Sequence, residues 1–103
     1  MLTPQLACDL LVTALEGGSN YWLDTYQPHL SGYGNVINYA PDKTWTFAVD
    51  GESETVTTTW SDLQQALHKM PRHHLDNIKN DNWDAETADV WLQCALFGEI
   101  VYG

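Results

Sequence analysis

The chain has 103 residues, 44% of them hydrophobic, and carries 14 acidic residues against four Lys and Arg, for a net charge of -10. This length indicates a single domain over residues 1–103, and no segment approaches the ~18 apolar residues that a membrane span needs. Direct DNA or RNA binding is excluded, because it draws most of its affinity from Lys and Arg at phosphates. The acids favour solubility and encounter with a basic protein surface.

The compartment is indicated by the start of the chain and by the cysteines. Met1 leads into "LTPQLACDLL" without the basic residues of a secretory signal. Cys8 and Cys94 each lie among apolar residues of an expected helix, which is typical of buried thiols rather than of a disulfide framework. We therefore expect the protein to stay in the cytoplasm where it is made.

The first expected element is a helix. Thr3 and Pro4 form a typical helix start, because the hydroxyl can cap free amides and proline suits the first helical position. Apolar residues then recur at helical spacing up to Leu15. Gly17 or Gly18 is expected to end this helix in the left-handed conformation.

The middle of the chain has the pattern of extended structure. Alternating aromatic and β-branched residues predict strands at 21–27, 36–40, 45–49 and 56–60. Proline and aspartate in "APDK" and the pair Asp50-Gly51 predict tight turns between them. Short turns imply antiparallel pairing.

The last part of the chain is expected to be helical. Ser61 to Gln64 has the pattern of a capping box before a helix that reaches Pro71, and Leu75 and Ile78 suggest a further helical turn. A final helix is predicted at 84–97, followed by a short strand at 100–102. The fold class is therefore α+β: an antiparallel sheet of three to four strands, with an N-terminal helix and two to three C-terminal helices packed on one face.

The sequence offers little for catalysis or metal binding. His68, His73, His74 and Asp76 match none of the usual zinc spacings, and no cysteine pair supports them. No nucleophile elbow such as G-x-S-x-G is present. We expect no catalytic residues, no metal, no cofactor and no enzymatic activity.

One candidate site is the glycine-rich joint "EGGSNYW" (residues 16–22). Its amides can turn inward to form a cradle, and Tyr21 and Trp22 can stack on a base or a sugar. The structural alternative is a helix cap followed by the start of a strand. The ligand-binding candidates are Glu16, Gly17, Gly18, Asn20, Tyr21 and Trp22.

The other candidate site is an acidic surface. One group of carboxylates is expected at a hairpin tip and the other around a helix start, where acids are also favoured without any function. If both groups share a face, they can occupy a groove built for phosphates. The partner-binding candidates are Asp50, Glu52 and Glu54, with Asp81, Trp83, Asp84, Glu86 and Asp89.

Two stretches of the chain carry a resemblance. "EGGSNYW" and "TADVWLQCALFGEIVYG" (residues 87–103) resemble a family of small uncharacterised proteins of bacteriophages and related mobile elements. That family has no established activity, so the resemblance implies no catalytic residues. By analogy of origin, it implies a protein that acts on host machinery, as anti-CRISPR and anti-restriction proteins do.

These observations lead to two main hypotheses. The first is a phage-type accessory protein that binds and inhibits a host defence protein through its acidic surface, with a nucleic-acid-handling complex of basic surface as the partner. The alternative is a protein that sequesters a small molecule or nucleotide signal at the Gly17–Trp22 joint. A third possibility is pairing with another phage protein or with a second copy of the chain through exposed aromatics.

Overall fold

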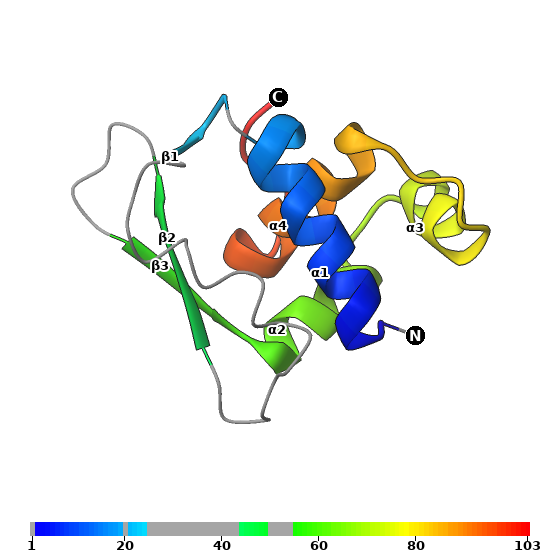
Figure 1. The fold of residues 1–103 in the computed structure, drawn as a ribbon, viewed down its shortest axis with the longest axis horizontal. Helices are drawn as coiled ribbons and strands as arrows, with labels where there is room; N and C mark the ends of the chain where they lie inside the picture. Colours follow the sequence, from blue (N-terminus) through cyan, green and yellow to red (C-terminus); the bar gives the residue numbers. More distant parts are fainter. Residues whose placement is uncertain (1, 20, 25–43, 50–54) are drawn as a thin grey trace.

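The structure is a computed structural model that describes residues 2–19, 21–24, 44–49 and 55–103. Within these ranges the fold is α+β, as predicted, and Figure 1 shows the sheet on one side and the helices on the other. The elements in chain order are α1 (Pro4–Thr13), a π-helical segment (Ala14–Gly18), β1 (Leu23–Asp24), β2 (Thr44–Val49), β3 (Thr55–Thr59), α2 (Trp60–Gln65), a 3₁₀ turn (Ala66–His68), α3 (Arg72–Lys79) and α4 (Ala85–Phe97).

The sheet is antiparallel and small. β2 pairs with β3 from Thr44 opposite Thr59 to Ala48 opposite Thr55, and the two residues of β1 pair with the other edge of β2. In the described part of the chain, only β2 and β3 are strands of ordinary length, which is fewer than the three to four predicted. The strand expected at 36–40 and the Asp50-Gly51 turn lie outside the described residues.

The helices form the core between themselves and one face of the sheet. Leu10, Leu63 and Trp91 are fully buried, and Phe47 reaches the same cluster from β2. The indole N–H of Trp91 donates to the carbonyl of Leu63 over 3.1 Å, which ties α4 to α2. Each large apolar side chain buried in this way contributes about 1.5–3 kcal/mol, and together they fix α4 at the centre of the molecule (Figure 1).

Most helix ends follow from local sequence. Thr3 caps α1, Asp84 caps α4 by accepting from the Thr87 N–H over 3.1 Å, and Gly98 ends α4 with φ +78°. The capping box predicted at Ser61–Gln64 was wrong: Thr59 and Asp62 form it, with reciprocal bonds of 3.1 Å. Helix α2 therefore begins at Trp60, which the sequence pattern had placed on a strand.

The N-terminal joint differs from the expected helix cap. The Ser19 N–H donates to the Ala14 carbonyl over 2.7 Å, so the chain widens into a π turn. Within the described residues, positive φ among glycines occurs at Gly98 and at neither Gly17 nor Gly18. Gly18 is instead a point of close approach, since a Cβ there would clash with the Ala85 carbonyl. Contact with α4, and not a left-handed cap, shapes this joint.

Two further expectations concern the last third of the chain. Leu75 and Ile78 lie on α3, a full helix of 8 residues. The predicted strand at 100–102 was wrong, because this stretch pairs with no strand of the described sheet and lies along α4 instead. No described helix is both long and apolar enough for a transmembrane span.

Candidate functional site

Asp89 on α4 is the centre of a buried polar network. Its Oδ1 accepts from the Ser19 hydroxyl over 2.8 Å and from the Trp22 indole N–H over 2.7 Å. Its Oδ2 accepts from the Tyr21 hydroxyl over 2.8 Å. Asp89 is only 7% exposed, and a carboxyl group taken out of water is stable only when such donors replace the lost water. The joint is therefore fixed to α4 by one side chain.

Gln93, one helical turn after Asp89, connects the same network to the end of the described chain. Its Oε1 accepts from the backbone N–H groups of Val101 and Tyr102 over 2.8 and 2.7 Å. Its Nε2 donates to the Tyr102 carbonyl and to Asp89, over 3.0 and 3.1 Å. Gln93 is fully buried. It holds the tail (residues 100–103) against α4.

Aromatic packing completes this arrangement. The rings of Trp22 and Tyr102 stack with centroids 5.2 Å apart and planes 5° from parallel, and the Phe97 ring lies 5.5 Å from Trp22 and 5.9 Å from Tyr102. Trp22 is buried. The joint and the tail, which belong to the two stretches "EGGSNYW" and "TADVWLQCALFGEIVYG", thus meet in space although they are far apart in the sequence.

A groove of about 700 Å³ opens beside this network, which we call the joint groove. Its walls come from the joint, the start of α3, the start of α4 and the tail. The described residues that line it are Gly17, Gly18, Tyr21, Pro71, His73, His74, Ala85, Glu86, Asp89, Val90, Ile100, Tyr102 and Gly103. No Lys or Arg is among them, so a bound anion would find no full positive charge there.

Tyr21 lines this groove and has a hydroxyl group with a raised pKa. Desolvation, together with the hydrogen bond to Asp89, raises the pKa of Tyr21 to about 12. The residue is nevertheless 52% exposed. Tyr21 therefore combines a fixed orientation with an accessible ring.

Two histidines also line the joint groove. His74 is buried, and its Nδ1 is 3.1 Å from the Thr87 hydroxyl, while the exposed His73 ring lies 4.1 Å from the His74 ring. On the same helix, Arg72 and Asp76 form an exposed ion pair of 4.0 Å. Among the described residues, no group of three or more His, Cys, Asp or Glu is placed to hold a metal ion.

The structure describes one of the two groups of the predicted acidic surface. Asp81, Asp84 and Glu86 are exposed around the start of α4, and the Thr87 backbone N–H lowers the pKa of Asp84 below its usual value. The assignment of Asp89 to an exposed acidic face was wrong, since the hydrophobic stripe of α4 turns it inward. Trp83 is half-buried and packs against the core, and Asp50, Glu52 and Glu54 lie outside the described residues.

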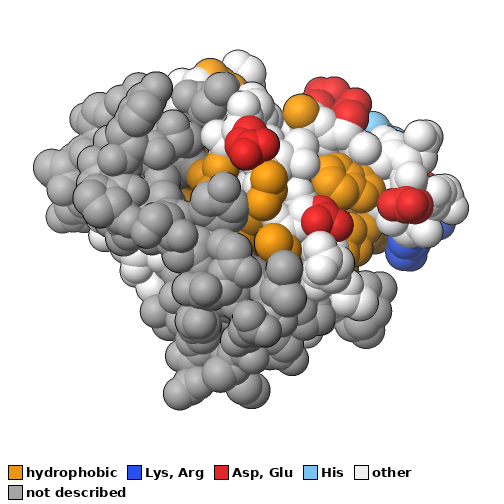
Figure 2. Space-filling view, viewed as in Figure 1, with side chains coloured by type: hydrophobic (Ala, Val, Ile, Leu, Met, Phe, Trp, Pro, Cys, Tyr) orange, Lys and Arg blue, Asp and Glu red, His pale blue; other side chains and the backbone are white. Residues whose placement is uncertain are grey.

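The described acids are also spread out on the face that Figure 2 shows. Figure 2 shows carboxylates separated from one another across the described part of the viewed face, with basic side chains at its right edge near α3. Of the acids named above, Glu86 and Asp89 line the joint groove. Within the described residues, the joint groove is where members of the two predicted sets, Glu86 and Asp89 with Gly17, Gly18 and Tyr21, come together.

The ligand-binding candidates divide in a similar way. Gly17, Gly18 and Tyr21 line the joint groove, whereas Trp22 is buried behind it and Glu16 is exposed outside its lining. Asn20 lies outside the described residues. Ser19, Gln93 and Tyr102 were not among the predicted site residues. One pattern in the sequence does indicate this network: Asp89 and Gln93 are polar, lie four residues apart and interrupt the apolar stripe of one helix.

Cys8 and Cys94 are free and buried, as predicted. Burial raises the pKa of both thiols, which makes them poor nucleophiles. The Cys94 thiol lies 3.6 Å from the Lys69 carbonyl.

Comparison with known proteins gives no further assignment. No protein-family model, curated protein sequence or solved structure matches the chain.

Proposed function

We propose that this protein is a non-enzymatic accessory protein that binds another protein through the joint groove and its acidic rim. The partner has a basic surface, and the resemblance to phage proteins favours a host defence protein that handles nucleic acid. Binding there would inhibit the partner by covering its basic surface. The proposed interface is acidic, as in the hypothesis from the sequence, but its centre is the joint groove.

The observation that carries the proposal is the location of exposed apolar surface. The exposed large hydrophobic side chains in the described part of the chain are Tyr21, Ile100 and Val101. Tyr21 and Ile100 line the joint groove, and Val101 follows Ile100 in the tail. Exposed hydrophobic groups gathered at one place are typical of interaction sites, and tyrosine is a frequent anchor of such sites.

Charge and rigidity add support. Glu86 lines the groove and Asp84 lies just before it at the start of α4, while no Lys or Arg lines the described groove. Such a rim attracts a partner with Lys or Arg around an apolar centre. The network of Asp89 and Gln93 holds Tyr21 and the tail in place before binding, so less conformational entropy is lost on association.

Affinity capture from a bacterial host lysate tests this proposal. Wild type and Asp9→Lys, which changes an exposed acid of α1, should retain the same partner. Glu86→Lys and Val101→Ser should lose it, by about tenfold or more, while their circular dichroism stays unchanged. Capture by all four proteins alike would place the interface elsewhere and contradict the proposal.

A second candidate, sequestration of a small molecule, is favoured by one observation. The groove volume of about 700 Å³ lies in the range of ligand pockets. The absence of Lys and Arg from its described lining favours a neutral or cationic ring over a phosphorylated ligand.

Native mass spectrometry of the gently purified protein separates the two candidates. A small added mass that is lost in His73→Ala, an exposed lining residue, would support the small molecule. Trp22→Ala is unsuitable for this test, because Trp22 is buried and its removal would damage the fold. A protein mass that is lost in Val101→Ser would support the first candidate.

A further inference from the structure

A second cavity, which shares no lining residue with the joint groove, has a different chemistry. It has a volume of about 560 Å³ and lies between α1, the α2 to 3₁₀ region and α3. We call it the α1–α3 pocket. Its described lining residues are Leu6, Gln64, Gln65, Leu67, His68, Leu75, Ile78 and Lys79.

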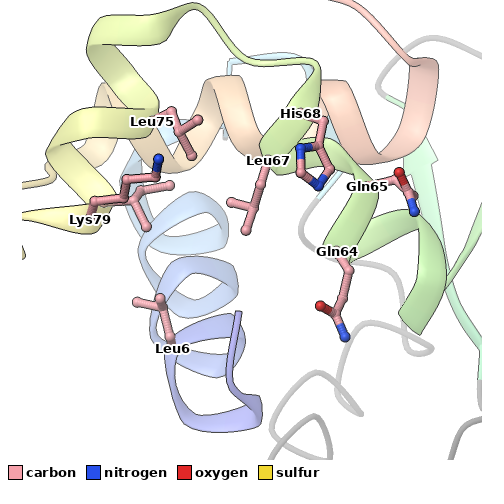
Figure 3. Close-up of a pocket in the computed structure, with 8 residues that line it drawn as sticks. Leu6, Gln64, Gln65, Leu67, His68, Leu75 and Lys79 are labelled. Atoms are coloured by element: carbon pink, nitrogen blue, oxygen red, sulfur yellow. The ribbon is translucent and has the colours of Figure 1, made fainter. Parts of the chain in front are cut away.

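The walls of this pocket are aliphatic and come from separate elements. Leu67 and Ile78 are buried, and Leu6 and Leu75 are partly buried against the core. Figure 3 shows Leu6, Leu67 and Leu75 around the same open space. Aliphatic side chains from different helices facing one cavity suit a flexible hydrocarbon chain, because each added CH₂ buried there gains about 0.8 kcal/mol.

The charge of the pocket is opposite to that of the whole chain. The protein has 14 acidic residues and four Lys and Arg, yet the described lining contains Lys79, His68 and two glutamines and no Asp or Glu. Figure 3 shows the Lys79 amino group beside the aliphatic walls. The exposed ion pair found among the described residues joins Arg72 and Asp76 of the same helix. Lys79 is not part of this ion pair.

We propose that the α1–α3 pocket binds a small amphiphilic anion, with its hydrocarbon chain against Leu6, Leu67 and Leu75 and its carboxylate at Lys79. A lysine ammonium at the edge of an apolar cavity binds a carboxylate by a charge-assisted hydrogen bond. A ligand with a hydrocarbon chain and no anionic group would form no ionic contact with Lys79. A ligand with a cationic head group would be repelled by the Lys79 ammonium. The pocket is independent of the joint groove, since the two share no lining residue.

The test is a titration of the full chain with decanoate, followed by amide chemical shifts in NMR and by calorimetry. Decanoate should bind saturably, with the largest shifts at Leu6, Leu67 and Leu75. Decyltrimethylammonium, which has the same chain length and the opposite charge, should bind at least tenfold more weakly.

Substitutions of lysine test whether Lys79 binds the carboxylate of decanoate. Lys79→Gln should weaken decanoate binding by about threefold to tenfold, and Lys79→Arg should retain it. Lys69→Gln is the matched control, because Lys69 is exposed and lies outside the pocket lining.

Three results of the experiments with decanoate and the variants would overturn the proposal. They are equal binding of the two amphiphiles, unchanged affinity of Lys79→Gln, or shifts confined to the joint groove. An acidic amphipathic peptide that shifts the pocket residues while decanoate does not would identify a protein segment as the occupant and would overturn it too.

Discussion

Asp89 illustrates how one residue can determine the shape of a surface that it barely reaches. Its two oxygens bind side chains of Ser19, Tyr21, Trp22 and Gln93, and through Gln93 the effect extends to the tail. Without this carboxyl group, the buried donors of Ser19 and Trp22 would lose their acceptor, while Tyr21 and Gln93 would keep the Tyr102 carbonyl. The rim of the joint groove depends on these donors for its position.

Asp89→Asn should therefore lower the free energy of unfolding by about 2–4 kcal/mol. The amide keeps the volume but replaces one acceptor oxygen by a donor that faces other donors. Urea unfolding followed by fluorescence measures the change. Glu86→Gln, an exposed acid on the first turn of the same helix, is the control and should change stability by less than about 0.5 kcal/mol. Equal effects of the two substitutions would refute the role given to Asp89.

Tyr21 gives a pH-dependent readout of the same network. The pKa is raised from 10.0 to about 12, so the folded state favours the neutral phenol. The stabilisation is fully present below pH 10 and is lost as pH rises through 12. An ultraviolet titration of wild type minus Tyr21→Phe should show a tyrosinate transition near pH 12. A transition centred on the ordinary value of 10.0 would show that the hydroxyl is not held in the network.

At the scale of elements, the π-helical segment explains why two adjacent glycines have different roles. Gly17 has open space around a hypothetical Cβ, whereas at Gly18 a Cβ would meet the Ala85 carbonyl. The π turn brings Gly18 and Ser19 against the start of α4. Gly18 is required by packing, and Gly17 is not.

Gly18→Ala should destabilise the protein by about 1–3 kcal/mol, because the added methyl group must push α4 away. Gly17→Ala should be neutral or stabilising by about 0.4–1 kcal/mol, because it restricts the unfolded chain without a clash. Thermal unfolding of the two variants side by side measures the difference. The reverse order would mean that Gly17, and not Gly18, contacts α4.

The elements that could be predicted from sequence are those fixed by local chemistry. The cap at Thr3 and the end of the last helix at Phe97 depend on neighbouring residues only, and the structure confirms both predictions. The π turn could not be predicted, because its cause is a contact with α4, about 70 residues away. Likewise, helical periodicity shows that Asp89 is near the apolar stripe but does not show that donors from the joint will meet it.

At the scale of the whole molecule, charge is the dominant feature. With a net charge of -10 and four basic side chains, repulsion among carboxylates opposes compaction. Raising the salt concentration from about 10 mM to about 150 mM shortens the Debye length from about 30 to about 8 Å. The urea midpoint should therefore rise with salt.

A variant with Glu16→Gln and Glu99→Gln, both exposed acids, provides the control. It should be more stable than wild type at low salt, and the two proteins should converge at high salt. A midpoint that falls as salt is added would indicate that attractive ion pairs outweigh repulsion.

The joint and α4 are connected by hydrogen bonds that span 67 to 72 positions of the chain. Contacts of this separation carry a large loop-closure cost, so they form after the local helices during folding. Asp89→Asn should then accelerate unfolding and leave the folding rate almost unchanged in a chevron experiment. The lifetime of the folded protein, more than its speed of folding, depends on this one carboxyl group.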